Sequence, residues 1–231
     1  MVKNVALDYT DEAPVYDQRR YASFAGNFYV ELTNNLISDL IELKPNDRIL
    51  DVATGTGRVA VGQALRGAEV DAVDLTPAML NRAREKAEAA GVNIRFQRAD
   101  AFSLPFEADT FNAVISTRFF HLLPPDTYPA LLQEMVRVAK PGGKIVVEWN
   151  TPFCNFLLKP FWGGQPSLNP KEACRLMEKA TGRVLAVRGL MFPGFGHIAR
   201  LNNRLASTLA TRLNRFPVAH LCTQYLVVGE K

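Results

Sequence analysis

The chain has 231 residues, of which 48% are hydrophobic, and carries 27 basic and 23 acidic side chains for a formal net charge of +4. This length and composition suit one domain with a sizeable buried core. No stretch approaches the roughly eighteen uninterrupted apolar residues of a transmembrane helix. Cys154, Cys174 and Cys222 lie far apart without a Cys-x-x-Cys pair, so neither a disulfide framework nor a zinc site is indicated and we expect no metal.

Up to residue 149, short apolar runs that predict strands alternate with segments that predict helices. Lys44-Pro45-Asn46-Asp47 marks the turn into the first strand, and Thr76-Pro77 is an N-cap followed by proline at the first helical position. Strands separated by helices imply parallel pairing. The predicted helices are 28–43, 58–66, 77–91 and 127–139, and the predicted strands are the run ending at residue 51, then 70–74, 93–98, 111–117 and 144–149.

The last third of the chain has a different composition. Residues 150–165 are rich in proline, glycine and aromatic side chains, and they predict a loop or lid just beyond a strand end. A helix is predicted over 169–181, and two further strands are predicted at 183–192 and 220–229.

A basic amphipathic helix is predicted over residues 197–216. Apolar residues recur at helical spacing from Ile198 to Phe216, and arginines form an adjacent stripe. Seven basic and no acidic residues lie from Lys179 to Gly229. One interpretation is a helix laid on the sheet with its arginines in water. The other is a surface for an anionic acceptor, an anionic lipid or the membrane face, with RNA less favoured.

The most informative motif is the glycine turn that follows the first strand. Gly55-Thr56-Gly57 allows a tight turn and brings backbone N–H groups close to a ligand before a helix begins. Taken alone, the glycines also fit a dinucleotide site. Acidic residues stand at three successive strand ends, at Asp51, Asp74 and Asp100, and two carboxylates would repel a pyrophosphate. These three carboxylates instead suit adenosine with a cationic tail, so we infer that the ligand is S-adenosylmethionine.

An ordered set of motifs resembles the class I S-adenosylmethionine-dependent methyltransferases, in particular the small-molecule branch with the ubiquinone and menaquinone C-methyltransferases. The resemblance runs roughly from residue 16 to residue 229, and it implies a Rossmann-like, doubly wound, mostly parallel seven-stranded α/β sheet with an antiparallel final strand and helices on both faces. Its motifs are Leu-Asp-Val-Ala-Thr-Gly-Thr-Gly at 50–57, Val-Asp-Leu-Thr-Pro-Ala-Met-Leu at 73–80, Asp-Ala-Phe-Ser-Leu-Pro-Phe at 100–106, Phe-Asn-Ala-Val-Ile-Ser at 111–116 and Lys-Pro-Gly-Gly-Lys at 140–144.

These motifs divide the predicted single methyltransferase domain, residues 1–231, into three parts. Residues 1–45 form an N-terminal helical lid, 46–149 the cofactor-binding core, and 150–231 the acceptor side with the loop, the basic helix and the last strands. Asp51 is expected near the methionine amino group, with local N–H capping as the alternative, and Asp74 at the ribose. The full set of expected cofactor residues is Tyr16, Tyr21, Asp51, Ala53, Thr54, Gly55, Gly57, Asp74, Leu75, Met79, Asp100, Ala101, Phe102, Ser116 and Thr117.

The predicted catalytic residues follow the fourth strand, because ligands bind at the carboxyl ends of strands in open α/β sheets. His121 is a candidate general base, since its unperturbed pKa lies near neutrality, and the alternative is a packing role at a helix start. Arg118 is either a clamp for an anionic acceptor or a solvated side chain. Asn112 stands where family members usually place Asp, which argues against catalysis at that position.

The sequence therefore predicts methyl transfer to oxygen or carbon of a small, largely apolar acceptor that is aromatic, quinone-like or lipid-like. The alternatives are N-methylation of an amine or phospholipid headgroup, a nicotinamide-dependent dehydrogenase, and a non-catalytic module that keeps the cofactor and binds RNA or membrane. Nucleic acid is an unlikely partner because Ser116-Thr117-Arg118-Phe119 replaces the Asn/Asp-Pro-Pro-aromatic motif of base methyltransferases. The acidic N-terminus lacks a signal-peptide pattern, and we expect a cytoplasmic protein.

Overall fold

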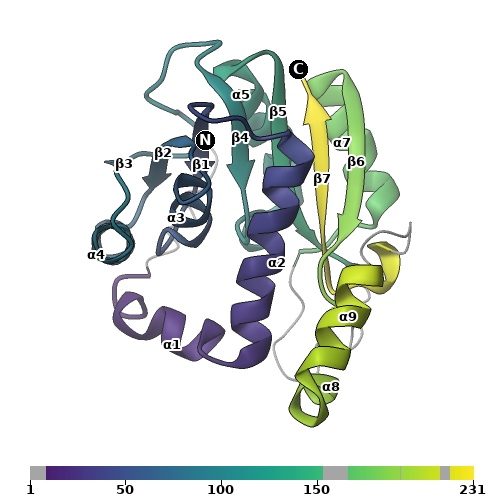
Figure 1. The fold of residues 1–231 in the computed structure, drawn as a ribbon. Helices are drawn as coiled ribbons and strands as arrows, with labels where there is room; N and C mark the ends of the chain where they lie inside the picture. The colour runs from purple at the N-terminus through teal and green to yellow at the C-terminus, as the bar shows by residue number, and fades with distance from the viewer. Residues whose placement is uncertain (1–8, 153–165, 193, 214–218) are drawn as a thin grey trace.

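The computed structural model describes residues 9–152, 166–192, 194–213 and 219–231 (Figure 1). Its centre is a seven-stranded sheet with the strand order β3-β2-β1-β4-β5-β7-β6. Strands β1 to β5 pair in parallel, and β7 is antiparallel to both β5 and β6. The strands are β1 (Arg48–Val52), β2 (Glu69–Asp74), β3 (Ile94–Arg98), β4 (Phe111–Ser116), β5 (Ala139–Asn150), β6 (Arg183–Gly189) and β7 (Gln224–Glu230).

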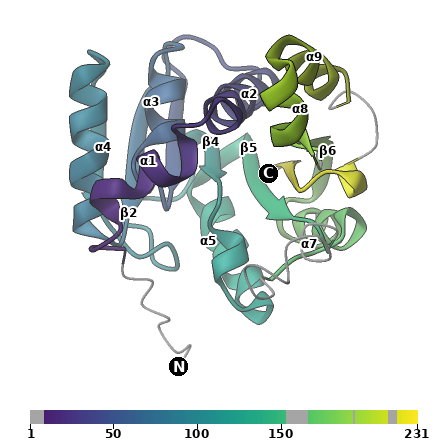
Figure 2. The same cartoon turned by 90° about the horizontal axis from the view of Figure 1, so that it is seen from below.

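Helices cover both faces of the sheet, as Figure 2 shows from below. One apolar core joins α5 and α7 to the sheet, and a second joins α2, α3 and α4 to its other face. This arrangement confirms the predicted fold class. The helices are α1 (Tyr16–Tyr21), α2 (Phe24–Ile41), α3 (Arg58–Ala64), α4 (Pro77–Ala89), α5 (Tyr128–Val138), α7 (Pro170–Thr181), α8 (Phe195–Leu201) and α9 (Asn203–Leu213).

Local signals set several of these boundaries. Ser23 caps α2 by accepting a hydrogen bond from the Gly26 N–H at 3.1 Å. Asn169 and Glu172 form a reciprocal capping box at the start of α7. At the other end of α2, Glu42 takes a left-handed conformation with φ of 54°. Most predicted elements from residue 28 to residue 181 lie within a few residues of these bounds, but β5 begins at Ala139 rather than at residue 144.

The predicted helix over 197–216 is wrong as one element, because Asn202 divides it. Asn202 ends α8 with φ of −155° and ψ of 101°. Its side-chain Oδ1 then accepts a hydrogen bond from the Leu205 N–H at 2.9 Å, which is the geometry of an N-cap for α9. The apolar period continues across the break, so periodicity could not reveal it. Residues 214–216 of the prediction lie outside the described residues.

Two further strand predictions extended beyond the observed bounds. Strand β6 ends at Gly189 rather than at residue 192, and β7 begins at Gln224 after a short 3-10 turn at Ala219–Leu221. The loop predicted at 150–165 begins within β5, and 153–165 lie outside the described residues. Among the described helices, none is both long and apolar enough to cross a membrane.

Candidate active site

In the turn after β1, every second residue from 53 to 57 has a left-handed backbone conformation. Ala53, Gly55 and Gly57 have φ of 57°, 55° and 74°. A Cβ on Gly57 would lie 2.8 Å from the Cβ of Ala83 in α4, so this glycine permits close packing between the turn and a helix. A Cβ on Gly55 would meet no atom within 4 Å. Gly55 therefore faces open space in the pocket, whereas Gly57 does not.

Asp74 connects the end of β2 to the glycine turn. Its Oδ2 accepts a hydrogen bond from the Gly55 N–H at 2.8 Å, and its Oδ1 accepts one from the Thr76 N–H at 2.9 Å. Burial raises the pKa of its carboxyl. Each oxygen of an ionised carboxylate can accept more than one hydrogen bond. Asp74 can thus position the turn and still accept from two ribose hydroxyls.

Asp51 is bonded to its own turn. Its Oδ2 accepts hydrogen bonds from the Thr54 hydroxyl at 2.6 Å and the Ala60 N–H at 3.1 Å. Burial raises the pKa of the Asp51 carboxyl to about 7. The local capping role that the sequence left open is therefore present in the structure.

The end of β3 supplies a second polar turn. The Phe102 N–H donates to Asp100 Oδ1 at 3.0 Å, which fixes the carboxylate at the strand end. Leu75, the residue after Asp74, is 46% exposed, unlike most large apolar side chains of the protein. An exposed apolar face between two strand-end carboxylates fits a purine ring with its ribose at one edge.

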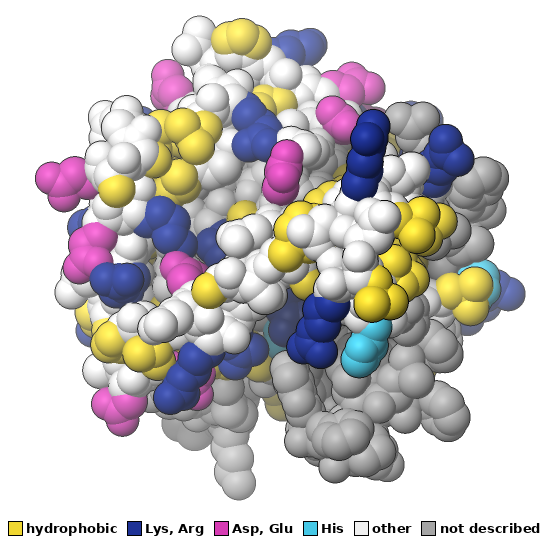
Figure 3. Space-filling model, turned by 60° about the horizontal axis from the view of Figure 1, so that its bottom comes forward, with side chains coloured by type: hydrophobic (Ala, Val, Ile, Leu, Met, Phe, Trp, Pro, Cys, Tyr) yellow, Lys and Arg dark blue, Asp and Glu magenta, His cyan; other side chains and the backbone are white. Residues whose placement is uncertain are grey.

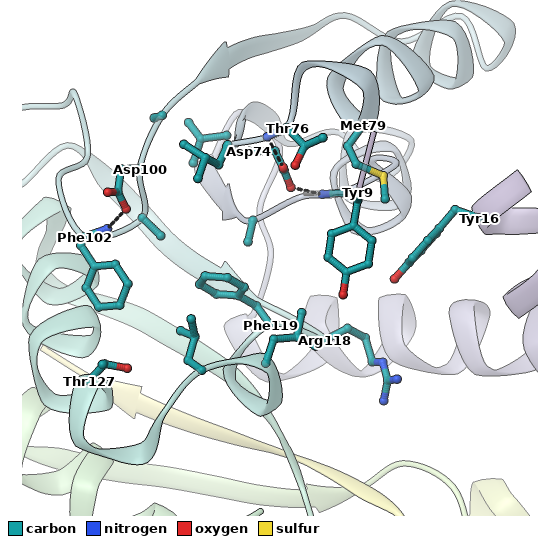
Figure 4. A pocket seen from close by; sticks show the side chains of 18 of the residues that line it. Tyr9, Tyr16, Asp74, Thr76, Met79, Asp100, Phe102, Arg118, Phe119 and Thr127 are labelled. Atoms are coloured by element: carbon teal, nitrogen blue, oxygen red, sulfur yellow. Dashed lines mark hydrogen bonds between the residues drawn. The ribbon is translucent and has the colours of Figure 1, made fainter. Parts of the chain in front are cut away.

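One pocket gathers these strand ends (Figure 4). Asp100 lies at the left of the view and Asp74 and Thr76 at the top, whereas Tyr9 and Tyr16 lie to their right and Arg118 below Tyr9. Of the residues predicted from sequence, the pocket brings together Tyr16, Ala53, Gly55, Asp74, Leu75, Met79, Asp100, Ala101, Phe102 and Arg118. The residues that sequence reasoning missed are Tyr9, Val73, Thr76, Ala99, Phe119, Leu122, Leu123, Pro124 and Thr127.

Seven predicted site residues do not line this pocket. Gly57 packs on α4, Asp51 and Thr54 bond each other, and the Ser116 hydroxyl donates to the Val52 carbonyl at 3.1 Å, joining β4 to β1. The full set is Tyr21, Asp51, Thr54, Gly57, Ser116, Thr117 and His121.

Within the predicted lid, residues 1–45, α1 carries two tyrosines that have separate environments. Tyr16 lines the pocket, whereas Tyr21 stacks on Tyr29 with ring centroids 6.1 Å apart and carries the Arg58 guanidinium 3.8 Å from its ring centre. Asp17 holds this helix on the glycine turn, because it accepts a hydrogen bond from the Thr56 hydroxyl at 2.7 Å. The helix is therefore anchored directly beside the turn.

His121 lacks the properties of a general base. It lies in a short 3-10 turn, is buried, and stands outside the pocket lining. Burial, followed by the positive charges of Arg118 and Arg20, lowers the pKa of His121 to about 3. A group this weakly basic stays neutral at physiological pH and accepts a proton poorly. The packing role is the interpretation that the structure favours.

Arg118 belongs to a group of polar side chains that we call the arginine cluster, consisting of Arg118, Glu148, Tyr29 and Asn150. The Tyr29 hydroxyl donates to Glu148 Oε2 at 2.7 Å. Arg118 Nη1 lies 4.0 Å from Glu148 Oε1 and 3.5 Å from Asn150 Oδ1. Sequence reasoning missed Glu148, although a lone carboxylate within the apolar run of β5 was a signal for it.

Comparisons with known proteins give a consistent result. Residues 49–143 match the family model described as a methyltransferase domain. An uncharacterized protein of Mycobacterium tuberculosis is 41% identical over 125 residues, 54% of this chain and 44% of that protein. The demethylmenaquinone methyltransferase of Thermus thermophilus is 41% identical over 142 residues, 60% of this chain and 62% of that enzyme. The chain thus aligns with roughly half the length of these curated relatives.

Among solved structures, the magnesium protoporphyrin IX methyltransferase of Synechocystis PCC 6803, determined with bound SAH, superposes with a TM-score of 0.69. The two chains are 12% identical, and the match covers 96% of each. At this identity the superposition supports the fold.

The sheet topology and the carboxylates at its strand ends are typical of α/β proteins that bind a nucleoside at the carboxyl edge of the sheet. The match over residues 49–143 shows a methyltransferase domain in the core of the chain, and the similarity to a demethylmenaquinone methyltransferase over 60% of the chain agrees with it. The resemblance stated from sequence is thereby confirmed.

Proposed function

We propose that the protein transfers a methyl group from S-adenosylmethionine to oxygen or carbon of a small, largely apolar acceptor. The proposal rests on one observation: the same pocket is lined by the carboxylates at the ends of β2 and β3 and by Arg118 of the arginine cluster. Apolar side chains, among them Phe102, Phe119, Leu122 and Leu123, form much of the remaining lining of this pocket. A cofactor site and an acceptor site can therefore adjoin.

The residues present fit the cofactor. Asp74 has accepting capacity for the ribose, Leu75 offers an exposed apolar face, and Asp100 with the Ala101 backbone stands where a purine edge can be recognised. When bound, the sulfonium supplies an electrophilic methyl carbon. The protein's contribution is then to hold donor and acceptor in line, and orientation of this kind is worth on the order of 7 to 11 kcal/mol.

A quinol-like acceptor is supported by the 41% identity to the demethylmenaquinone methyltransferase of Thermus thermophilus. The test is to incubate the protein with S-adenosylmethionine and a panel of quinols, phenols, amines and phospholipids, and to measure S-adenosylhomocysteine. Formation with quinols or phenols supports the proposal. Formation with amines alone would favour N-methylation, and binding of NADH without binding of S-adenosylhomocysteine would favour a dehydrogenase.

A further inference from the structure

The part of the pocket beside Arg118, where we place the acceptor, has few side chains that could accept a proton. Its carboxylates, Asp74 and Asp100, stand at the cofactor side and accept hydrogen bonds from the backbone. Burial raises the pKa of the Tyr9 hydroxyl, so Tyr9 is neutral at physiological pH. His121 is outside the lining and nearly non-basic. Among the described lining residues, neither a carboxylate nor an imidazole stands beside Arg118 to remove a proton.

Arg118, in contrast, has hydrogen-bonding capacity to spare. A guanidinium has five N–H donors and stays protonated. The described partners of Arg118 are Asn150 at 3.5 Å and Glu148 at 4.0 Å, both longer than an ordinary N–H···O hydrogen bond. The side chain is only 14% exposed. Arg118 is thus held in the pocket wall opposite Glu148, with N–H donors that no described side chain accepts at ordinary hydrogen-bond length.

The arginine cluster fixes this charge in place. Tyr29 holds one oxygen of Glu148, and the other oxygen, Oε1, is buried without a hydrogen-bond partner among the described residues while it faces Arg118. Arg118 itself has φ of 56°, a left-handed conformation that a long side chain adopts only at a cost. Such strained residues gather at ligand-binding positions.

We infer that Arg118 is a subsite for an anionic oxygen and that the acceptor is a phenol or enol bound as its anion. This inference rests on the proposed function and names its acceptor class. The acceptor loses its proton to solvent on binding. The electron pair of the phenolate oxygen, or of the enolate carbon, then forms a bond to the methyl carbon while the carbon–sulfur bond breaks toward sulfur. After attack through an aromatic carbon, that carbon releases its proton to water.

The test uses 4-nitrophenol, whose phenolate absorbs visible light, with protein saturated by S-adenosylhomocysteine. Titration with pH should show a lower pKa for the bound probe than for the free probe. In Arg118→Met the phenolate should bind about tenfold more weakly or worse, because a hydrogen bond to a charged group is lost. Arg118→Lys should retain part of the effect. Arg84→Met removes an exposed arginine of α4 and should change nothing.

The carboxylate of the cofactor's amino-acid part is a second anion that Arg118 could bind. Calorimetry distinguishes this carboxylate from an acceptor anion. S-adenosylhomocysteine and 5′-methylthioadenosine, which lacks the amino-acid carboxylate, should each bind Arg118→Met as they bind the wild type. If Arg118→Met weakened only S-adenosylhomocysteine, Arg118 would hold the cofactor and the inference would be overturned. An unshifted probe pKa, or no phenolate binding at millimolar concentration, would also overturn it. Failure of the wild type to bind S-adenosylhomocysteine would instead refute the proposed function.

A separate observation concerns α8 and α9, which lie beside α2 at the lower edge of the molecule (Figure 1). Leu201 is 90% exposed and Leu205 is 50% exposed, although both are large apolar side chains. Arg200, Arg204 and Arg212 are exposed on the same two helices. Figure 3, with the underside turned forward, shows apolar and basic side chains next to one another on this face.

The geometry points to an anionic lipid bilayer as the occupant of this surface. Exposed leucines can enter the headgroup boundary, and the basic side chains with no acidic residue from Lys179 to Gly229 complement a negative surface. A nucleic acid would use the arginines but not the leucines.

Co-sedimentation with vesicles of phosphatidylglycerol and phosphatidylcholine tests this surface. Binding should require phosphatidylglycerol, weaken with salt, and fall several-fold in Leu201→Asp. Leu65→Asp is the matched control, because Leu65 is 60% exposed at the end of α3. Equal loss in both variants, or binding to RNA but not to vesicles, would overturn the assignment.

Discussion

The cofactor side of the pocket and the arginine cluster are constructed in different ways. At the ends of β1, β2 and β3, each carboxylate accepts hydrogen bonds from the backbone or a hydroxyl of the adjoining turns. In the arginine cluster, the partly buried Arg118 guanidinium and the buried Glu148 carboxylate face each other at 4.0 Å, too far apart for a hydrogen bond of ordinary length between them. The cofactor side has its hydrogen bonds formed without a ligand, whereas Arg118 retains N–H donors that no described side chain accepts at ordinary hydrogen-bond length. This difference fits the proposed roles, in which the first side binds the cofactor and Arg118 binds the acceptor.

The largest expected effect concerns the rigidity of the cofactor side. Gly57→Ala should lower the free energy of unfolding by roughly 2–5 kcal/mol, because a left-handed alanine is strained and its Cβ would meet Ala83 at 2.8 Å. Gly55→Ala, with a similar φ but no atom within 4 Å, should cost only about 1–2 kcal/mol. Denaturant unfolding compares them, and equal losses would show that packing on α4 is unimportant.

Asp74→Ala should leave the protein folded and weaken S-adenosylhomocysteine binding by about 1.5–3 kcal/mol, because a buried sugar hydroxyl loses a charged acceptor. Calorimetry measures this loss. Asp39→Ala, on the exposed face of α2, should bind like the wild type. An undiminished affinity in Asp74→Ala would remove Asp74 from the ribose site.

Asp51→Asn should alter the pH dependence of stability. Burial raises the folded-state pKa of Asp51 to about 7, from an ordinary value near 3.8. The folded state therefore binds more protons than the unfolded state between these values, and stability falls as pH rises through this window. A single group contributes up to about 1.4 kcal/mol per pH unit. Thermal unfolding across this range should show a flatter slope in Asp51→Asn, whereas the exposed Asp126→Asn should keep the wild-type slope.

Glu42→Gly measures how much a left-handed φ costs in stability at a position outside the pocket, and we expect a small effect. Glu42 ends α2 with φ of 54° and is exposed, so Glu42→Gly should stabilise the protein by about 1 kcal/mol. Thermal unfolding measures the gain. A loss of stability would mean that the left-handed φ at this position carries no penalty, and the strain assigned to Arg118 would be weakened with it.

The difference between the cofactor side and the arginine cluster also explains which parts of the site could be predicted from the sequence. The glycine turn, Asp74 and Asp100 were predictable because the signals are local and their hydrogen bonds connect neighbouring turns. The bond between Tyr29 and Glu148 joins residues 119 positions apart, and no spacing rule specifies such a pair. His121 had a suitable position in the chain, but its burial beside Arg118 depends on the tertiary structure.

A crystal structure with S-adenosylhomocysteine would show whether the ends of β2 and β3 hold the cofactor nucleoside while Arg118 faces the acceptor. We expect ribose hydroxyls within hydrogen-bond distance of Asp74, the base beside Leu75 and Asp100, and no contact between Arg118 and the cofactor carboxylate. A ribose bound away from Asp74, or a cofactor carboxylate paired with Arg118, would contradict this expectation.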